Sequence, residues 1–194
     1  MAGRASKPQG DSILGAIGCL VASRSAVYVS TPLTTGRRWA EWAAQAGAPN
    51  PGNRDYGRLL EAAVVGPNRE NARHFVQALR TETHATVIDP SALPDVSGWT
   101  QPDYRAFWAE VIERYAQTVV FLDGWEYSHG CAYEYLVATK CGAETLSQDM
   151  APITLSQAIA LIRAAIQEFL KRGQPVDFLE EIVGRLDRER SARA

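Results

Sequence analysis

The fold is constrained most by a short apolar run that ends in a turn and continues directly into a helical pattern. Thr118 to Leu122 has the length and the β-branched content of a buried strand. The turn Asp123-Gly124-Trp125 follows it, and Ser128 to Cys141 has the start signal and the periodicity of a helix. Because parallel strands need a crossover between them, a strand that leads into a helix in this way is typical of a parallel sheet.

The same alternation of strand and helix occurs earlier in the chain. Strand character is found in Ala26 to Ser30 and in Ala85 to Ile88, and helical periodicity in Asn68 to Arg80 and in Asp103 to Tyr115. Ala143 to Leu146 is a candidate fourth strand. This order predicts an α/β fold, a parallel sheet with helices on both faces, which binds its ligands beyond the carboxyl ends of the strands.

Residues 1–25 precede the first expected strand. Arg4 and Lys7 before an apolar stretch, Ile13 to Ala22, are similar to the start of a signal peptide, but Asp11 interrupts the basic region. We therefore expect a flexible start and a short amphipathic helix, followed by an α/β domain over residues 26–148.

Two further segments fall outside the alternation. Residues 37–66 form a long insertion with aromatic residues around a Gly- and Pro-rich loop, and we expect it either to cap the cleft or to pack as a helical hairpin. Residues 149–194 form a C-terminal helical extension with two amphipathic helices, Leu155 to Lys171 and Val176 to Arg188. Its charged end, Arg188 to Ala194, is expected to fray.

Composition excludes several classes of function. The 194 residues are 46% hydrophobic and contain no apolar run of the ~18 residues that a membrane helix needs, which predicts a soluble domain without a membrane partner. The net charge of -2, from 20 basic and 22 acidic residues, gives no electrostatic footprint for polymeric nucleic acid. The three cysteines lack metal-ligand spacing and one would remain unpaired, so we expect a reducing, cytoplasmic location and no metal site.

The common motifs for nucleotide cofactors are absent from the sequence, which has neither a Walker loop nor the glycine fingerprint of dinucleotide-binding folds. We therefore expect no cofactor. The loop after the first strand, Ser30 to Gly36, is instead rich in hydroxyl groups and is followed by Arg37 and Arg38. Such a loop is suited to holding an oxyanion, although an ordinary polar turn has the same composition.

Glu134 is the candidate catalytic residue. It lies in the first turns of the helix that begins near Ser128, where backbone N–H groups and the helix dipole stabilise negative charge. An ionised carboxylate at the mouth of a cleft is what a glycosyl nucleophile needs. The alternative is a carboxylate that only stabilises its helix. Ser128 suits an N-cap under both interpretations, and Trp125 is either a packing residue or a base-stacking surface.

Four segments of the chain resemble the DUF4406 family, over roughly residues 26 to 148. They are Val27 to Pro32, the helix that begins near Asn68, Val87 to Pro90, and Phe121 to Glu134. The pattern Ser128-x-Gly130-x-x-x-Glu134 is the most specific part of the resemblance. This family is similar in turn to the nucleoside 2-deoxyribosyltransferase superfamily and to its nucleotide N-glycosidase members.

The resemblance implies a flavodoxin-like or Rossmann-like sheet, commonly assembled as a homodimer or a higher homo-oligomer with sites near the subunit contacts. It also implies that Glu134 attacks the anomeric carbon, giving a glycosyl-enzyme intermediate that water or another base resolves. The residues expected to contact a nucleoside or nucleotide lie at the strand ends and at the helix start: Tyr28, Ser30, Thr31, Pro32, Asp123, Gly124, Trp125, Ser128 and Gly130.

The serine at position 128 separates two branches of the superfamily. Enzymes that act on unphosphorylated nucleosides resemble this chain except for an aspartate at the position of Ser128, whereas the nucleotide N-glycosidases have serine. An aspartate would repel a 5′-phosphate, while a hydroxyl group beside a helix N-terminus can donate a hydrogen bond to it. A nucleoside 5′-monophosphate is therefore favoured over a free nucleoside.

The chain departs from the family pattern at two places. Thr31 replaces the glycine that usually precedes Pro32, which restricts the approach of the backbone to a ligand. The second carboxyl group, the general acid that serves the leaving base, has no clean counterpart. Asp103, Glu110 and Asp89 are the candidates for this role.

Two functions from different classes remain open. One is an enzyme that cleaves the N-glycosidic bond of a nucleoside 5′-monophosphate or nucleoside, by hydrolysis or by deoxyribosyl transfer. The other is a module of the same fold that binds or senses a nucleotide without chemistry, which the missing general acid favours. A structural assembly protein that acts through its C-terminal helices is a third.

Overall fold

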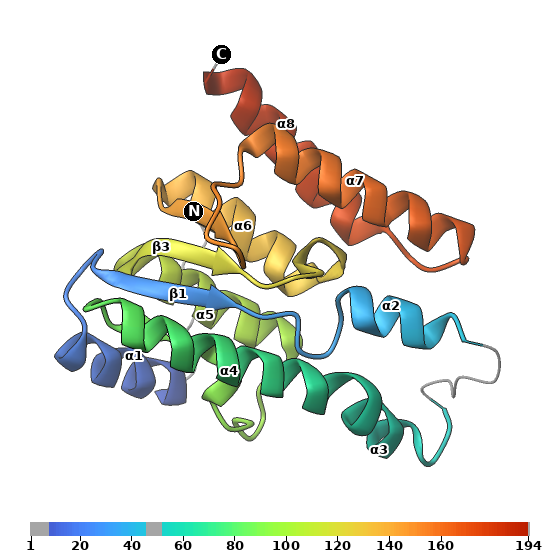
Figure 1. Cartoon of the computed structure of the whole chain (residues 1–194), viewed down its shortest axis with the longest axis horizontal. Helices are drawn as coiled ribbons and strands as arrows, with labels where there is room; N and C mark the ends of the chain where they lie inside the picture. The colour runs from blue at the N-terminus through green and yellow to red at the C-terminus, as the bar shows by residue number, and fades with distance from the viewer. Residues whose placement is uncertain (1–7, 46–51, 194) are drawn as a thin grey trace.

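The computed structural model describes residues 8–45 and 52–193, and a four-stranded sheet lies at its centre (Figure 1). The strands are β1 (Ala26–Ser30), β2 (Val87–Ile88), β3 (Ala116–Phe121) and β4 (Glu144–Ser147). All pairs are parallel and the order is β2-β1-β3-β4. This confirms the predicted parallel sheet. The chain changes direction across the sheet between β1 and β3, and in such sheets ligands bind at this switch point.

Helices and helical turns connect the strands. None of the helices in the described residues is both long and apolar enough to cross a membrane. In chain order they are α1 (Pro8–Leu20), α2 (Arg37–Ala43), α3 (Tyr56–Leu60), the π-helical turn η1 (Glu61–Val65), α4 (Gly66–Glu82), the 3-10 turn η2 (Pro90–Ala92), α5 (Gln101–Tyr115), the 3-10 turn η3 (Trp125–Tyr127), α6 (His129–Cys141), α7 (Leu155–Lys171) and α8 (Asp177–Arg193).

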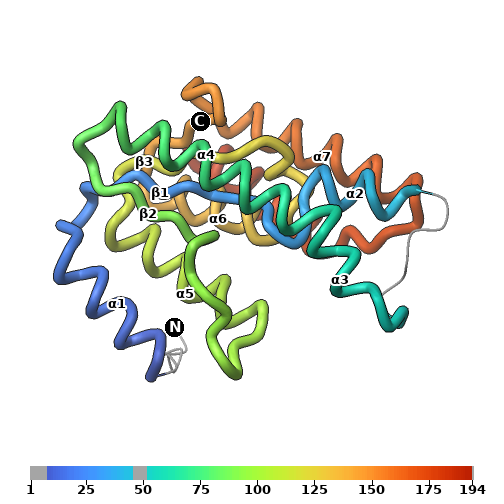
Figure 2. The backbone as a smooth tube through the Cα atoms, turned by 60° about the horizontal axis from the view of Figure 1, so that its bottom comes forward, coloured from blue at the N-terminus to red at the C-terminus, as the bar shows by residue number. Residues whose placement is uncertain are grey.

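The sheet is covered on both faces, as predicted. Figure 2 shows α4 on one side of β1 and β3 and α5 on the other. The buried residues divide accordingly into two clusters. Ala72 and Val76 of α4 pack with Val29 of β1, whereas Ile112 of α5 and Leu136 of α6 belong to the larger cluster. The architecture is therefore an α/β fold of the flavodoxin or Rossmann kind.

The alternation of side chains along β1 positions the candidate site. Val29 is directed to the α4 face, so its neighbours Tyr28 and Ser30 are directed to the opposite face, where α6 lies. Ser30 is paired in register with Phe121, the last residue of β3. The carboxyl ends of the two central strands are therefore level, beneath the start of α6.

The N-terminal helix begins earlier than expected and ends at Leu20. Leu14 is buried, and its carbonyl oxygen accepts a hydrogen bond from the hydroxyl group of Tyr115 at 3.3 Å. This contact holds α1 against α5. The flexible start that we expect before the helix concerns residues 1–7, which lie outside the described residues.

The insertion over residues 37–66 is helical, with α2, α3 and η1. The rings of Trp42 and Tyr56 lie 5.7 Å apart and join α2 to α3. None of the described residues of the insertion lines the cavity of the candidate site, which favours the helical packing over the cap. Residues 46–51, most of the Gly- and Pro-rich loop, lie outside the described part.

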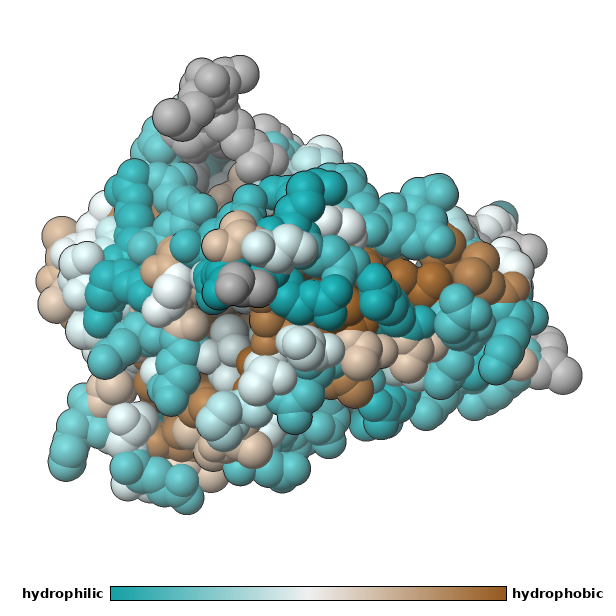
Figure 3. Space-filling view, turned by 90° about the horizontal axis from the view of Figure 1, so that it is seen from above, coloured by the Kyte–Doolittle hydropathy of each residue, from teal (hydrophilic) through white to brown (hydrophobic). Residues whose placement is uncertain are grey.

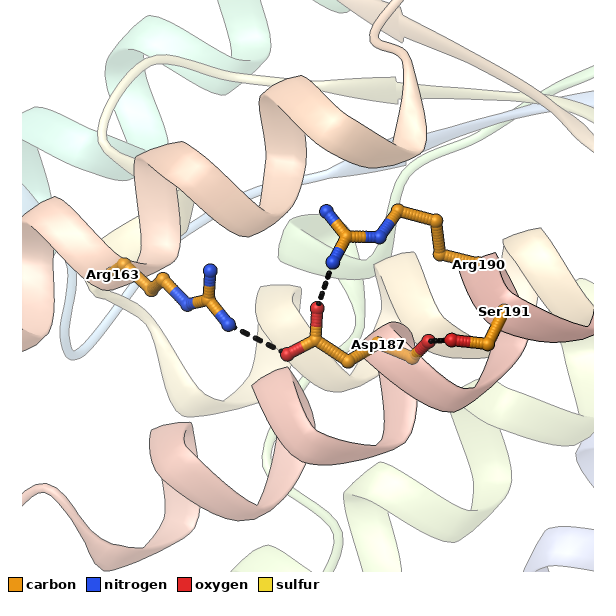
Figure 4. A network of polar contacts seen from close by, with 4 residues as sticks. All are labelled: Arg163, Asp187, Arg190 and Ser191. Carbon is orange, nitrogen blue, oxygen red and sulfur yellow. Dashed lines mark hydrogen bonds and ion pairs between the residues drawn. The ribbon is translucent and has the colours of Figure 1, made fainter. Parts of the chain in front are cut away.

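The C-terminal extension consists of α7 and α8, which pack against each other, as α8 does against α6. Figure 4 shows Asp187 of α8 in contact with two guanidinium groups. Arg163 of α7 donates to it at 2.7 Å and Arg190 of α8 at 2.9 Å. The bond from Arg163 joins the two helices on their exposed side, whereas the bond from Arg190 lies within α8.

The expectation that the charged end frays is wrong for the described residues. The helix α8 continues to Arg193, whose guanidinium group donates to the carbonyl oxygen of Thr139 at 2.6 Å. Glu189 forms an ion pair with Lys140 of α6 at 3.4 Å. Two of the charged residues that predicted a solvated tail therefore have partners on α6, which only the tertiary structure brings near.

Candidate functional site

Glu134 lies in α6 at the wall of a cavity of about 390 Å³ above the ends of the central strands. Its exposed fraction is 9%, so the carboxyl group is buried but borders an open space. The cavity is formed by the loop after β1, the segment after β2, one face of α5 and the start of α6. Its lining comprises Thr31, Leu33, Thr34, Thr35, Pro90, Leu93, Asp95, Gln101, Tyr104, Arg105, Trp108, Ser128, His129, Gly130, Cys131 and Glu134.

Two hydroxyl groups of β1 orient the carboxyl group of Glu134. Tyr28 donates to Oε1 at 2.8 Å and Ser30 donates to Oε2 at 2.6 Å. Both donors are uncharged, and no ion pair of Glu134 occurs among the described residues. Each carboxyl oxygen keeps a further lone pair, so the group remains able to accept a bond from the cavity side.

Burial raises the pKa of Glu134 to about 7, against the hydrogen bonds from Ser30 and Tyr28, which lower it. Position in the helix alone predicts an ionised carboxylate. The structure instead gives a group close to half-ionised at neutral pH, because loss of water outweighs the two donors. The pKa of Tyr28 is raised well above its ordinary value, first by burial and then by Glu134, so Tyr28 keeps its proton and remains a donor.

Ser128 is the N-cap of α6 and lines the cavity. Its Oγ accepts a hydrogen bond from the backbone N–H of Cys131 at 3.4 Å and lies 2.9 Å from the Oγ1 of Thr35. Gly130 also lines the cavity, and a Cβ built there would meet only Ser128 Oγ, at 3.8 Å. Because Gly130 has no side chain, the space in the cavity beside Ser128 stays open.

The loop after β1 is held from α4. The side-chain amide of Asn68 donates to the carbonyl oxygens of Pro32 and Leu33 at 2.7 and 3.0 Å. Pro32 does not line the cavity, whereas Thr31 does, and the Oγ1 of Thr31 is buried without a hydrogen-bond partner among the described residues. A buried hydroxyl group without a partner is costly, so a ligand in the cavity that bonds to it would relieve that cost.

Three residues expected to contact a substrate, Asp123, Gly124 and Trp125, do not line the cavity. The backbone N–H of Asp123 donates to Gln148. Gly124 has a φ of 81°, and a Cβ on it would lie 2.7 Å from the Cβ of Arg37. The ring of Trp125 is stacked on that of Tyr135 at 5.1 Å and is buried, which makes it a packing residue.

The three sequence candidates for the general acid do not line the cavity either. Asp89 accepts hydrogen bonds from the N–H and the hydroxyl group of Ser91 and caps η2. Asp103 accepts from the N–H of Thr100 in a capping box at the start of α5. Glu110 forms an ion pair with Arg114. The partners of these three carboxyl groups therefore come from residues nearby in the sequence.

Sequence reasoning missed Asp95, the other acidic residue that lines the cavity besides Glu134. Asp95 lies in the segment between η2 and α5 and is exposed. The segment is anchored at the next residue, because the N–H of Val96 donates to the hydroxyl oxygen of Tyr104 at 2.7 Å. Nothing in the local sequence distinguishes this aspartate from an ordinary loop residue.

Sequence reasoning also missed the face of α5 that lines the cavity, formed by Gln101, Tyr104, Arg105 and Trp108. Their spacing of i, i+3, i+4 and i+7 is that of one helix face, so the signal was present. The core side of α5, with Phe107 and its neighbours, obscured it because its apolar periodicity is stronger.

Two further groups of the cavity, His129 and Cys131, have pKa values that favour their neutral forms at pH 7. Burial lowers the pKa of His129, and the charge of Arg105 lowers it further. Burial, with a smaller contribution from Glu134, raises the pKa of Cys131 to about 12, so its thiol is protonated. Within residues 8–45 and 52–193, no group of three or more His, Cys, Asp or Glu side chains could hold a metal ion.

Comparison with known proteins gives one family match. The model of DUF4406, a domain of unknown function, matches residues 60–147. No curated protein and no solved structure matches the chain. The matched segment contains Ser128 and Glu134 but not β1, and it is shorter than the segment over which the sequence resembles the family. Over residues 60–147 the chain is therefore similar to the DUF4406 domain.

Proposed function

We propose that the protein is a nucleoside 5′-monophosphate N-glycosidase related to the nucleoside 2-deoxyribosyltransferases, with Glu134 as the nucleophile. The observation that carries the proposal is the state of this carboxyl group. It is buried at a cavity wall, is oriented by two uncharged hydroxyl donors, and has a pKa of about 7. A strongly perturbed carboxyl group beside a cavity favours chemistry over a structural role.

The geometry supports a double displacement. A carboxylate oxygen of Glu134 attacks C1′ of the sugar, the bond from C1′ to the base breaks, and its electron pair leaves with the base nitrogen, which takes up a proton. Water then attacks C1′ of the glycosyl ester and gives up a proton, and the bond from C1′ to the Glu134 oxygen breaks, which returns the carboxylate and releases the sugar phosphate. Tyr28 and Ser30 hold both oxygens throughout, so the attacking atom stays aimed.

The cavity offers different surfaces to the parts of such a substrate. Trp108 and Leu93 form an apolar wall that suits a planar base, while Thr31 and Ser128 bring hydroxyl groups. Ser128 at the start of α6 is favourable for a phosphate group, because hydroxyl and helix N-terminal donors converge there. This arrangement supports a monophosphate as the ligand.

Asp95 is our candidate for the group that serves the leaving base, in place of Asp89, Asp103 and Glu110. It shares the cavity with Glu134, and the anchored segment beside it fixes its backbone. The variant Asp95→Asn should release a neutral base ~100-fold more slowly. With 7-methylguanosine 5′-monophosphate, whose base is already cationic and needs no proton, the loss should be much smaller. Equal losses on both substrates would argue against this role.

The test of the proposed function is release of free base from the common ribonucleoside and deoxyribonucleoside 5′-monophosphates, followed by chromatography. Glu134→Gln should reduce the release by ~1,000-fold or more, because the nucleophile is lost. Glu110→Gln is the matched control, since its carboxyl group is paired with Arg114 outside the cavity, and it should act like the unmodified protein. Undiminished release by Glu134→Gln would exclude the mechanism.

A nucleotide-binding module without chemistry is the second candidate. The observation that favours it is that none of the three acids expected from the sequence lines the cavity. In that case a nucleoside monophosphate should raise the melting temperature without any release of base, and Glu134→Gln should leave this stabilisation unchanged.

The homodimer or higher homo-oligomer implied by the resemblance stays a prediction. Figure 3 shows hydrophobic residues gathered in a band on the face seen from above, among hydrophilic ones. Leu161 and Leu170 of α7 are among the exposed large hydrophobic residues, at 40% and 49%. Sedimentation of the full chain measures the oligomeric state, and a monomer at all concentrations would contradict the prediction.

A further inference from the structure

An arginine lines the cavity without a carboxylate partner. Arg105 of α5 is half-buried and forms no ion pair among the described residues, although Asp95 and Glu134 line the same cavity. Its guanidinium carbon lies 4.9 Å from the ring centre of Phe178, which belongs to α8. A guanidinium group stacked on an aromatic face keeps its N–H groups available at its edge, where they can bind an oxyanion.

His129, the first residue of α6, belongs to the same cluster. It lines the cavity, and its ring centre lies 5.2 Å from that of Phe178. Phe178 therefore contacts both Arg105 and His129, which come from different helices. Since burial and Arg105 both lower the pKa of His129, the imidazole is neutral and Arg105 supplies the positive charge of this end of the cavity.

We propose that Arg105, held in place by Phe178, binds the phosphate group of the ligand, together with the hydroxyl group of Ser128. This inference rests on the proposed function, which it deepens by assigning the phosphate to one end of the cavity. Arg105 is the binding residue, because it faces the cavity, and Phe178 is a positioning residue. The C-terminal extension thus completes a site whose other parts lie in the α/β domain.

The chain provides a matched control for a merely structural cation–π contact. Arg185 of α8 lies over the ring of Tyr133 of α6, with its guanidinium carbon 5.8 Å from the ring centre. Neither residue lines the cavity. Loss of Arg185 removes the same kind of contact between the same two layers of helices without removing a charge from the site.

The experiment measures binding by calorimetry on the full chain with Glu134→Gln, so that the ligands stay intact. The probes are the common nucleoside 5′-monophosphates, the corresponding nucleosides, and inorganic phosphate. Adding Arg105→Met should weaken monophosphate binding by ~10-fold or more and leave nucleoside binding within ~2-fold, because a charge-assisted hydrogen bond is lost only with the phosphate. Arg105→Lys should give a smaller loss, and Phe178→Leu should follow Arg105→Met in direction. Arg185→Met should change neither affinity.

Equal effects of Arg105→Met on nucleotide and nucleoside, or no effect on either, would overturn the assignment. Arg105→Lys serves the same comparison if the methionine variant does not fold.

The outcomes also separate the phosphate site from the proposed glycosidase activity. Binding that depends on Arg105, with no base released by the unmodified protein, upholds the phosphate site and refutes the glycosidase. Base release with an unchanged preference for the monophosphate in Arg105→Met does the reverse. Failure of every monophosphate to bind would refute both.

Discussion

Glu126 and Glu134 are two buried carboxyl groups on either side of Ser128, and their surroundings are opposite. Glu126 in η3 is 4% exposed and forms an ion pair with Arg37 at 2.5 Å. Glu134 in α6 is 9% exposed, faces the cavity and is bonded to hydroxyl groups alone. One carboxylate is neutralised by a cation, while the other can exchange its proton near neutral pH.

The comparison shows that two carboxyl groups of similar burial can have different kinds of partner. The ion pair of Glu126 joins η3 to the start of α2, and Arg37 also lies over the ring of Tyr127. The hydroxyl donors of Glu134 orient it without fixing its charge. A carboxyl group held in an ion pair and one with a pKa of about 7 can therefore lie close together in one chain.

The largest effect on stability is expected from Arg37→Met, which leaves Glu126 buried without a cation. Loss of one partner from a fully buried pair costs roughly 3–5 kcal/mol. Because Arg37 is 52% exposed and solvent screens its charge, we expect a smaller loss, about 2–3 kcal/mol, in the free energy of unfolding. Urea denaturation at pH 7 measures it. Arg69→Met is the control, since its pair with Glu61 is exposed on both sides and should be worth about 0.5 kcal/mol or less. Equal losses would contradict the structural role of the Glu126 pair.

A substitution at Gly124 also tests the position of Arg37, because the backbone of Gly124 packs closely against that residue. Gly124→Ala would place a Cβ at 3.0 Å from the backbone nitrogen of Arg37, in addition to the strain of a positive φ. Gly142 has a φ of 70° and nothing within 4 Å of such a Cβ, so Gly142→Ala suffers the strain alone. Gly124→Ala should destabilise the protein by about 2 kcal/mol more. Similar unfolding curves for the two variants would show that the backbone around Gly124 moves enough to accommodate the added Cβ.

The pH dependence of stability tests the state of Glu134. Its pKa is raised from 4.5 to about 7 by folding, so the folded state binds the proton more tightly. Its contribution is therefore fully present below pH 4.5 and is lost as pH rises through 7. In Glu134→Gln this loss is absent, and the variant should gain about 2 kcal/mol over the unmodified protein between pH 5 and pH 8. A constant difference across urea titrations in this range would show that the pKa is not raised.

The smallest effect is expected from Tyr28→Phe, which removes one of the two donors to Glu134. The hydrogen bond lowers the pKa of Glu134, so its loss should raise that pKa by about 1 unit. If the carboxylate is the nucleophile, base release rises with pH through about 7 in the unmodified protein. In Tyr28→Phe that rise should move to higher pH. An unmoved profile of release rate against pH would separate Tyr28 from the reactive group.

The fold could be predicted because its signals are local. Apolar runs, turn residues and helical periodicity define the strands and helices within a few residues, and the helix start at Ser128 with Glu134 behind it follows from the same signals. The sequence alone could not show how deeply Glu134 is buried. That depends on β1 and α5, which are distant in the chain, and burial decides the pKa.

The face of α5 that lines the cavity has a signal in its spacing, but the contacts that bring other residues to their places could not be predicted, for the same reason. Asp95 lies at the cavity beside Val96, whose N–H donates a hydrogen bond to the hydroxyl group of Tyr104. Arg105 contacts the ring of Phe178 in α8. The end of α8 is ordered by contacts with Thr139 and Lys140. In each case the residue type is common, and only the tertiary neighbour gives it a role.

The strand order β2-β1-β3-β4 has a consequence for dissection of the molecule. The segment that matches the family model contains β2, β3 and β4, yet β2 meets β3 only through β1, which precedes the segment. An excised fragment of residues 60–147 would hold the presumed nucleophile but lack the central strand and both hydroxyl groups that aim it. The smallest unit able to fold around this cavity therefore begins at or before Ala26.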